Sequence, residues 1–292
     1  MGLFLTILIN GCILGSVYAL VAMGLNTQYG VARILNIAHG EFIILAAFIT
    51  VFFNSRLHVH PLLALILAGP MIFGISFVLH RTLYKRVKDV SPNMDTFEGN
   101  AILVAFGVYF MVQNLMQTNW GSTAQAFQFM AYAVQIGPAK DPAKITAGNL
   151  YIFVIAVIIC IAYNLFLSKT RLGKAIRAAA QDPQAAAQLG VKINTIMALC
   201  FAIGGLLAAC AGVLIAMKET FTSISGLSYT TTAIIIIVLG GLGSVRGAIL
   251  GGFILGIVGF GISTVDTGLM LAVFYLIVLV LLIVRPKGLL GR

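Results

Sequence analysis

The chain has 292 residues, of which 60% are hydrophobic and only 9% charged, and its mean hydropathy is +1.06. An average soluble domain carries about 25% charged residues, so this composition excludes a soluble globular protein and indicates an integral membrane protein. The net charge of +10 would suggest a nucleic-acid partner in a soluble protein. Here the basic residues gather between apolar segments, which indicates a membrane topology instead.

Several apolar segments approach the roughly 20 residues that a helix needs to cross a hydrocarbon core. They are 3–25, 37–55, 61–80, 100–118, 149–168, 194–217, 228–242, 248–264 and 269–284. Because lipid offers the backbone no hydrogen-bond partners, we expect an all-α integral membrane protein, a polytopic bundle of about eight or nine transmembrane helices. Glycine is so frequent in 228–264 that one piece could be a broken or re-entrant segment, which would leave eight crossings.

The distribution of Lys and Arg predicts the orientation. If the 81–98 loop is cytoplasmic, fourteen of the 18 basic residues lie on its side, including Arg33 and Arg292, and four lie on the other: Arg56, Lys140, Lys144 and Lys218. This positive-inside bias places the N-terminus outside and the C-terminus in the cytoplasm. The first apolar segment has neither a basic start nor a small-residue cleavage site, so it predicts a retained helix. We expect one transmembrane domain, 1–292.

Catalytic motifs are missing from the sequence. Its Gly173-Lys174 pair is followed by Ala175, which excludes a P-loop, and we expect no catalytic residue, cofactor site or metal site in this chain. Cys12, Cys160, Cys200 and Cys210 fall in apolar segments without metal-type spacing and are expected to be small buried side chains. Glu41 is the one acidic residue expected within a helix, a scarcity that weakens an ion-coupled transporter but leaves it open, because unwound backbone can bind Na⁺.

The stretch LNIAHGEF, residues 35–42, follows a predicted polar turn, NTQYGVAR, at 26–33. Asn36 and Gly40 share a helical face, with His39 beside them. These residues could cap a helix that starts inside the protein or line a pathway, and His39 and Glu41 could equally form a structural pair. The candidate pathway residues, all polar groups at membrane depth or its edge, are Asn10, Asn36, His39, Gln113 and Asn114.

The stretch TRLGKAIRAAAQDPQAAAQLGV, residues 170–191, places a basic strip between two apolar segments. Asp182 suits a helix N-cap, Pro183 suits the first helical position and Gly190 suits the position that ends a helix, which predicts a separate helix of about two turns, roughly 10 Å long. Such a helix is marginal alone in water, so something should pack against it.

Two interpretations of this strip, the loop 169–193, stay open. It could be a solvated loop whose charges fix topology or touch anionic lipid. It could instead dock a cytoplasmic partner, with small alanines permitting close approach. The candidate docking residues are Asp182, Pro183, Gln184, Ala185, Ala186, Ala187, Gln188, Leu189 and Gly190.

Glycines recur every fourth position in VLGGLGSVRGAILGGFILG, residues 238–256. Such faces let helix backbones approach closely in a bilayer, so helix packing is the favoured interpretation. The packing candidates are Gly243, Gly247, Gly251, Gly252 and Gly256. Arg246 indicates a cytoplasmic turn within this run.

Five stretches together give the chain a family resemblance. They are GCILGSVYALVAMGL (11–25), LNIAHGEF (35–42), TRLGKAIRAAAQDPQAAAQLGV (170–191), GGLGSVRGAILGGFILG (240–256) and RPKGLLGR (285–292). In these stretches the chain resembles the membrane permease of Liv-type ABC importers of branched-chain amino acids. Related permeases transport urea, short amides and aromatic acids, and none of these motifs identifies the substrate.

The resemblance implies a set of partners in a bacterial or archaeal inner membrane. A second, similar permease, giving a heterodimer, would pair with this chain, and two cytoplasmic ATPases would bind the ATP and Mg. A periplasmic or extracellular binding protein would deliver the solute. Residues 182–190 would then form the coupling helix, lipid would surround the spans, and nucleic acid would have no role. A stand-alone channel or secondary transporter is the alternative, and a membrane-embedded enzyme has little support.

Overall fold

The computed structural model describes residues 2–58, 60–127, 129–136 and 143–291. Lys140 and Arg292, which the charge count includes, lie outside the described residues. In chain order the elements are α1 (Gly2–Ala32), α2 (His39–Leu57), α3 (Pro61–Leu79), the π-helix η1 (His80–Tyr84), α4 (Lys85–Val90), α5 (Met94–Trp120), β1 (Ala133–Ile136), β2 (Ala143–Thr146), α6 (Ala147–Lys169), α7 (Arg171–Gln181), α8 (Pro183–Gln188), α9 (Ile193–Lys218), α10 (Gly226–Gly240), α11 (Val245–Ser263) and α12 (Leu269–Val284).

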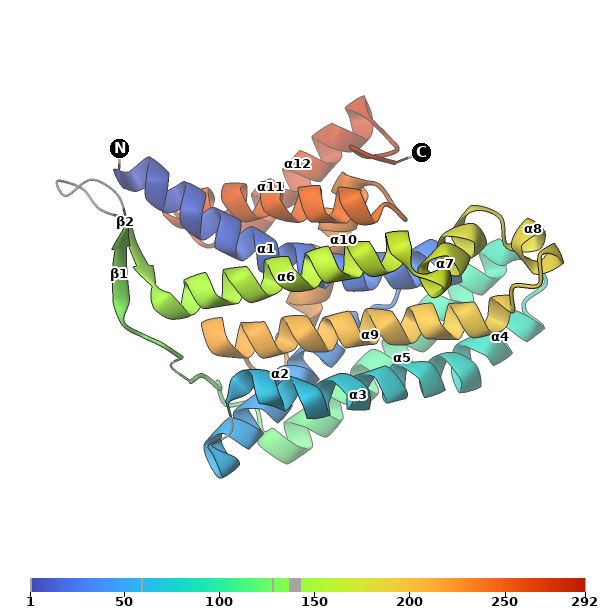
Figure 1. Cartoon of the computed structure of the whole chain (residues 1–292), viewed down its shortest axis with the longest axis horizontal. Coiled ribbons are helices and arrows are strands. Elements are labelled where there is room, and N and C mark those ends of the chain that lie inside the picture. Colours follow the sequence, from blue (N-terminus) through green and yellow to red (C-terminus); the bar gives the residue numbers. More distant parts are fainter. Residues whose placement is uncertain (1, 59, 128, 137–142, 292) are drawn as a thin grey trace.

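The two ends of the bundle differ in character. Figure 1 shows α4 and α8 at one end, and the chain's N-terminus with the antiparallel β1–β2 hairpin at the other. We call these the α8 end and the hairpin end. Because α9 leaves the α8 end and covers 26 residues, its last residue lies about 39 Å away along the helix axis.

All nine predicted apolar segments are helical. Seven described helical segments are long and apolar enough to cross a membrane, and α10 and α12, with 15 and 16 residues, are shorter apolar helices. The polytopic all-α prediction is therefore confirmed, and the protein is a multi-pass cell membrane protein. The glycine-rich run 228–264 divides into α10 and α11 at a turn over 241–244.

The polar turn predicted at 26–33 is wrong, because α1 stays helical to Ala32. The polar side chains here find partners inside the protein instead of water. Thr27 Oγ1 lies 2.6 Å from Tyr163 Oη of α6, and Gln28 Nε2 donates to the Phe201 carbonyl of α9 at 3.1 Å. Because these polar groups are hydrogen-bonded inside the protein, they can lie within a membrane helix. The hydropathy pattern alone ends the helix too early.

The predicted 81–98 loop is mostly helical as well. α3 continues without a break through η1 into α4, so a single helical segment runs from Pro61 to Val90. Asn93 then begins α5, since its side chain accepts a hydrogen bond from the Thr96 backbone N–H at 2.8 Å. The turn at this end of the bundle therefore has only a few residues.

The centre of the bundle is formed by α1 and α9. α1 packs against α11, α9, α6 and α10, and α9 packs against α1, α2 and α3. Nearly every residue from Ile196 to Met217 is buried, so α9 has almost no face left for lipid. By contrast α12 buries only Phe274 among its described residues.

Candidate docking and translocation sites

The basic half of the strip at 170–191 is a helix, α7, and not a loop. Ile176 and Ala179 are buried against the bundle, and Thr170 caps the helix by accepting a hydrogen bond from the Gly173 N–H at 2.9 Å. The basic residues occupy the exposed face: Arg171, Lys174 and Arg177. α7 therefore lies on the protein with its charges facing away from it, as an amphipathic helix does at a membrane surface.

α8 follows as a separate short helix with the predicted boundaries. Asp182 Oδ1 accepts hydrogen bonds from the backbone N–H groups of Gln184 and Ala185 at 2.9 and 3.0 Å. Gly190 has a φ of +84°, a left-handed conformation that glycine adopts without strain, and it ends the helix. The cap and the stop confirm the predicted helix, while its docking role stays a prediction.

The alanines of α8 do not all face the same way. Ala186 is 3% exposed and is the only buried residue of α8, whereas Ala185 and Ala187 are exposed. Leu189, next to the helix, is 84% exposed. Ala186 therefore attaches the helix, and the surface open to a partner consists of Ala185, Ala187 and Leu189 together with the exposed Pro183, Gln184 and Gln188.

α2 begins inside the protein, at two of the candidate pathway residues. Asn36 Oδ1 accepts from the Ala38 N–H at 3.2 Å, and His39 Nε2 donates to the Val21 carbonyl of α1 at 3.1 Å. Thr230 of α10 accepts from the Gly40 N–H at 2.8 Å. Asn36 and His39 are fully buried, and their hydrogen bonds support the start of α2.

Glu41 lies in the first turn of α2 and is also fully buried. Its carboxyl group lies against Gly226, the first residue of α10, where any Cβ would overlap it. Neither carboxyl oxygen has a hydrogen-bond partner among the described residues. The expected pair between His39 and Glu41 is therefore not formed, because the His39 ring bonds α1 while Glu41 turns toward α10.

The other three candidate pathway residues lie apart from this region. Asn10 is half-buried in α1, Gln113 is half-buried in α5, and Asn114 is exposed on α5. Each donates a hydrogen bond to a group of its own helix. Among the described residues, no hydrogen bond joins any of them to Asn36 or His39. The role of the five residues in a pathway stays a prediction.

The glycines of α11 lie on two different helix contacts. Gly252 and Gly256 face α1, and a Cβ at Gly252 would lie 2.5 Å from the Ala19 nitrogen. Gly247 and Gly251 face α10, where a Cβ at Gly251 would lie 2.9 Å from the Ile236 carbonyl oxygen. Backbone thus touches backbone on both sides of α11, and both contacts are within the subunit.

Gly243 differs from the other four packing candidates. It lies in the turn between α10 and α11 with a φ of +80°, so it is not part of a helix face. Its N–H donates to Asn26 Oδ1 of α1 at 2.8 Å, and its Cα faces Gly30. The fourfold spacing is misleading here, because the turn needs a residue that tolerates positive φ. Arg246, just after this turn, is exposed at the start of α11.

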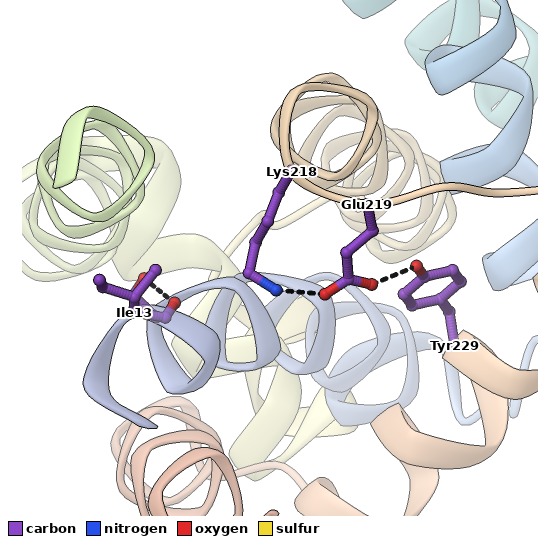
Figure 2. Close-up of polar contacts among 5 residues, drawn as sticks. Ile13, Lys218, Glu219 and Tyr229 are labelled. Carbon is purple, nitrogen blue, oxygen red and sulfur yellow. Dashed lines mark hydrogen bonds and ion pairs between the residues drawn. The ribbon is translucent and has the colours of Figure 1, made fainter. Parts of the chain in front are cut away.

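A charged cluster lies at the hairpin end, where α9 ends. Figure 2 shows the Lys218 ammonium and the Tyr229 hydroxyl approaching the two oxygens of Glu219. The Tyr229 hydroxyl of α10 donates to Oε2 at 3.0 Å. Burial raises the pKa of the Glu219 carboxyl, but the Lys218 charge and the two hydrogen bonds outweigh it, so this pKa lies below its ordinary value of 4.5. The cluster ties α9 to α10.

A cavity of about 200 Å³ opens at the α8 end between the end of α1, the start of α5 and α10. Arg33 and Glu98 are among its lining residues. Neither residue was predicted to be part of a site, because Arg33 counted only as a topology charge and Glu98 as an acidic residue in a loop. No motif joins them, because α1 and α5 bring them together only in the folded chain. Within the described ranges, no group of three or more His, Cys, Asp or Glu side chains could hold a metal ion.

The chain is similar to permeases of known transport systems over nearly its whole length. It is 32% identical to the high-affinity branched-chain amino acid transport system permease protein BraD of Pseudomonas aeruginosa, over 99% of this chain and 96% of that protein. It is 29% identical to LivH of Escherichia coli K12, over 99% and 96% of the two chains. A probable LivH of Methanocaldococcus jannaschii is 25% identical over 98% and 92%. No solved structure matches significantly.

The family comparison covers the same extent. Residues 7–285, from the early part of α1 to the end of α12, match the model of the branched-chain amino acid transport system permease component. That range includes the capped helix α8, the buried start of α2 and the glycine contacts of α11. The chain belongs to the branched-chain amino acid transport system permease family.

Proposed function

We propose that this chain is one of two membrane subunits of an ATP-binding cassette importer for branched-chain or other apolar amino acids. Two cytoplasmic ATPases bind and hydrolyse ATP with Mg, a second similar permease completes a heterodimer, and an extracellular or periplasmic binding protein delivers the solute. The chain itself is not an enzyme, and residues 1–292 act as one transmembrane domain.

The observation that carries this proposal is the geometry of α8. The helix is capped at Asp182, stopped at Gly190 and held to the protein through Ala186, so its remaining residues are free for a partner. An apolar side chain that is as exposed as Leu189 beside a short helix suits insertion into a groove of another protein. The α8 end also carries most of the positive charge, which favours its placement in the cytoplasm.

Transport follows alternating access between the two permeases. ATP-driven closure of the ATPases moves α8, and α7 passes the movement to the long helices on which it packs, α6, α1 and α9. The pathway then opens toward the binding protein, and hydrolysis resets it. Asn10, Asn36, His39, Gln113 and Asn114 remain the proposed polar groups of this pathway. The names of the relatives favour apolar amino acids over urea, short amides or aromatic acids.

The test places a charge on the exposed apolar residue beside α8. We expect Leu189→Asp to abolish both co-purification of the ATPases and uptake of leucine, with the permease still folded in the membrane, because an aspartate there cannot enter an apolar groove. Val265→Asp is a matched control, since Val265 is also 84% exposed but lies in the loop between α11 and α12. Retention of ATPase binding and uptake in Leu189→Asp would refute the docking role.

A second arm tests the transport class. Vesicles that contain this chain alone should show no leucine flux, whereas vesicles with both permeases, the ATPases and the binding protein should show ATP-dependent uptake. Leucine flux through the single chain without ATP would contradict the proposal and favour a channel or secondary transporter.

A further inference from the structure

The cavity at the α8 end has walls of two kinds. Ile102 of α5 and Ile234 and Ile237 of α10 supply an apolar wall, while Arg33 and Glu98 supply one charge of each sign. Ligand sites in proteins are concave and mainly apolar with a few placed polar groups, and this cavity has that composition. Its volume of about 200 Å³ suits a small molecule.

The two charges in the cavity are available to a ligand. Neither Arg33 nor Glu98 forms an ion pair with a described residue. The Arg33 guanidinium lies over the Tyr29 ring, 5.8 Å from its centroid, which fixes its position without neutralising its charge. An arginine can hold a carboxylate through two parallel hydrogen bonds, and a glutamate can accept hydrogen bonds from an ammonium group.

The backbone at Arg33 is held in an unusual conformation. Its φ is +55°, a left-handed value that non-glycine residues adopt in only a few per cent of cases. The Arg33 N–H still donates to the Tyr29 carbonyl at 3.0 Å, so the residue closes α1 while the chain turns back toward the buried start of α2. Such strain persists only where the surrounding structure imposes it, and at this position it directs a cation to the cavity.

We propose that this cavity binds the zwitterion of an apolar amino acid. Arg33 pairs with the α-carboxylate, Glu98 with the α-ammonium, and the isoleucines of α5 and α10 take the aliphatic side chain. The site lies at the α8 end, so it is the last site that the solute occupies before it leaves the transporter on the cytoplasmic side. This assignment rests on the proposed function for the direction of transport, and on the cavity alone for the ligand.

Leucine is the probe, and two analogues each lack one charge. Leucinamide has no carboxylate and isocaproate has no ammonium. We measure binding to the purified permease in nanodiscs of phosphatidylglycerol by saturation-transfer NMR, which detects weak ligands. A site that releases its solute should bind leucine at about millimolar concentration. We expect each analogue to bind about tenfold more weakly, because it can form only one of the two charge-assisted contacts with the exposed Arg33 and the half-buried Glu98.

Two variants connect each charge to its residue. In Arg33→Asn, asparagine tolerates the left-handed backbone, and leucine should bind no better than leucinamide. In Glu98→Gln, leucine should bind no better than isocaproate. Arg246→Asn and Asp95→Asn are matched controls: both residues are exposed at the starts of α11 and α5, and neither lines the cavity. Both controls should bind leucine as the parent chain does.

Three outcomes would overturn the assignment. Equal binding of leucine and its analogues would show that the site does not recognise the two charged groups of the ligand. Unchanged binding of leucine in both variants would place the site elsewhere. Phosphatidylethanolamine carries the same two charges, so loss of the leucine signal in nanodiscs of this lipid would identify its head group as the occupant. Uptake by the complete transporter distinguishes the cavity site from the proposed importer function. Normal uptake together with any of these results would refute the cavity site and leave the importer function standing.

Discussion

Where α1 crosses α11, the backbones of glycines touch directly, whereas α8 lies beside α7 and α9 with only one alanine buried. Gly11, Gly15, Gly252 and Gly256 leave no room for a single added carbon at the first contact. At the second, Ala186 is buried and every other residue of α8 is exposed. Close-packed interiors transmit a displacement as rigid pieces, while a helix with one buried residue can change its position at small cost.

The difference assigns separate mechanical roles to the two regions. We expect α1, α10 and α11 to move as one body, because their backbones are in close contact at the glycines of α1 and α11. In the proposed function α8 follows the ATPase, and α7, which packs on α6, α1 and α9, passes the movement on. The coupling role proposed for α8 would thus depend on weak attachment, and the rigidity of the three-helix unit on the glycines that bring its backbones into contact.

The largest effect is expected from an added methyl group in the rigid unit. In Gly256→Ala the new carbon would overlap the Gly15 backbone, which cannot shift without moving α1. Overpacking of this kind typically costs about 1–3 kcal/mol, so we expect the melting temperature of the purified protein to fall by about 2–10 °C. Gly107→Ala is the control, since nothing lies within 4 Å of a Cβ there. Equal melting temperatures for the two variants would contradict the backbone contact.

A smaller effect, confined to coupling, is expected from removal of the α8 cap. Asp182→Ala leaves the N–H groups of Gln184 and Ala185 without their acceptor, which costs about 1 kcal/mol and frays the helix. We expect ATPase affinity to fall about fivefold, the equivalent of that energy, with no change in the melting temperature. Asp182→Asn retains a capping oxygen and should bind ATPase normally. A fall in melting temperature would show that α8 is part of the rigid unit.

The smallest effect concerns the link between α9 and α10 at Glu219. A carboxyl group whose pKa is lowered on folding contributes stability above its unfolded pKa of about 4.5 and loses that contribution as the pH falls through the folded value. At pH 7 the parent chain should therefore have a higher melting temperature than Glu219→Gln. This difference in melting temperature should disappear below about pH 4.5. Tyr229→Phe removes one hydrogen bond to Glu219. In this background, the effect of Glu219→Gln on the melting temperature at pH 7 should therefore be smaller. A difference independent of pH would refute this role of the carboxylate.

The apolar spans were predictable because lipid imposes one solution on the backbone, and all nine segments are helical. The α8 boundaries followed from local rules at Asp182, Pro183 and Gly190, each of which acts within a few residues. Local chemistry of this kind needs no knowledge of the fold.

The errors arise where partners come from distant parts of the chain. Thr27 and Gln28 extend α1 because Tyr163 and Phe201 lie beside them, and the sequence around 26–33 holds no sign of either. The same applies to Ala186, whose burial depends on the surface beneath α8. Arg33 and Glu98 share a cavity only because α1 ends where α5 begins.

The loop before α10 has a consequence for the cavity at the far end of the same helix. Phe221 and Gln125 exchange two backbone hydrogen bonds, of 2.8 and 3.0 Å, which join the start of α10 to the segment that follows α5. The two helices are therefore fastened near the hairpin end and separated by the cavity at the α8 end. The hydrogen-bonded segment can act as a hinge, so a small rotation there produces the largest separation of α5 and α10 at the α8 end. A solute held between Arg33 and Glu98 lies where this separation is largest, so a small rotation at the hinge is enough to release it.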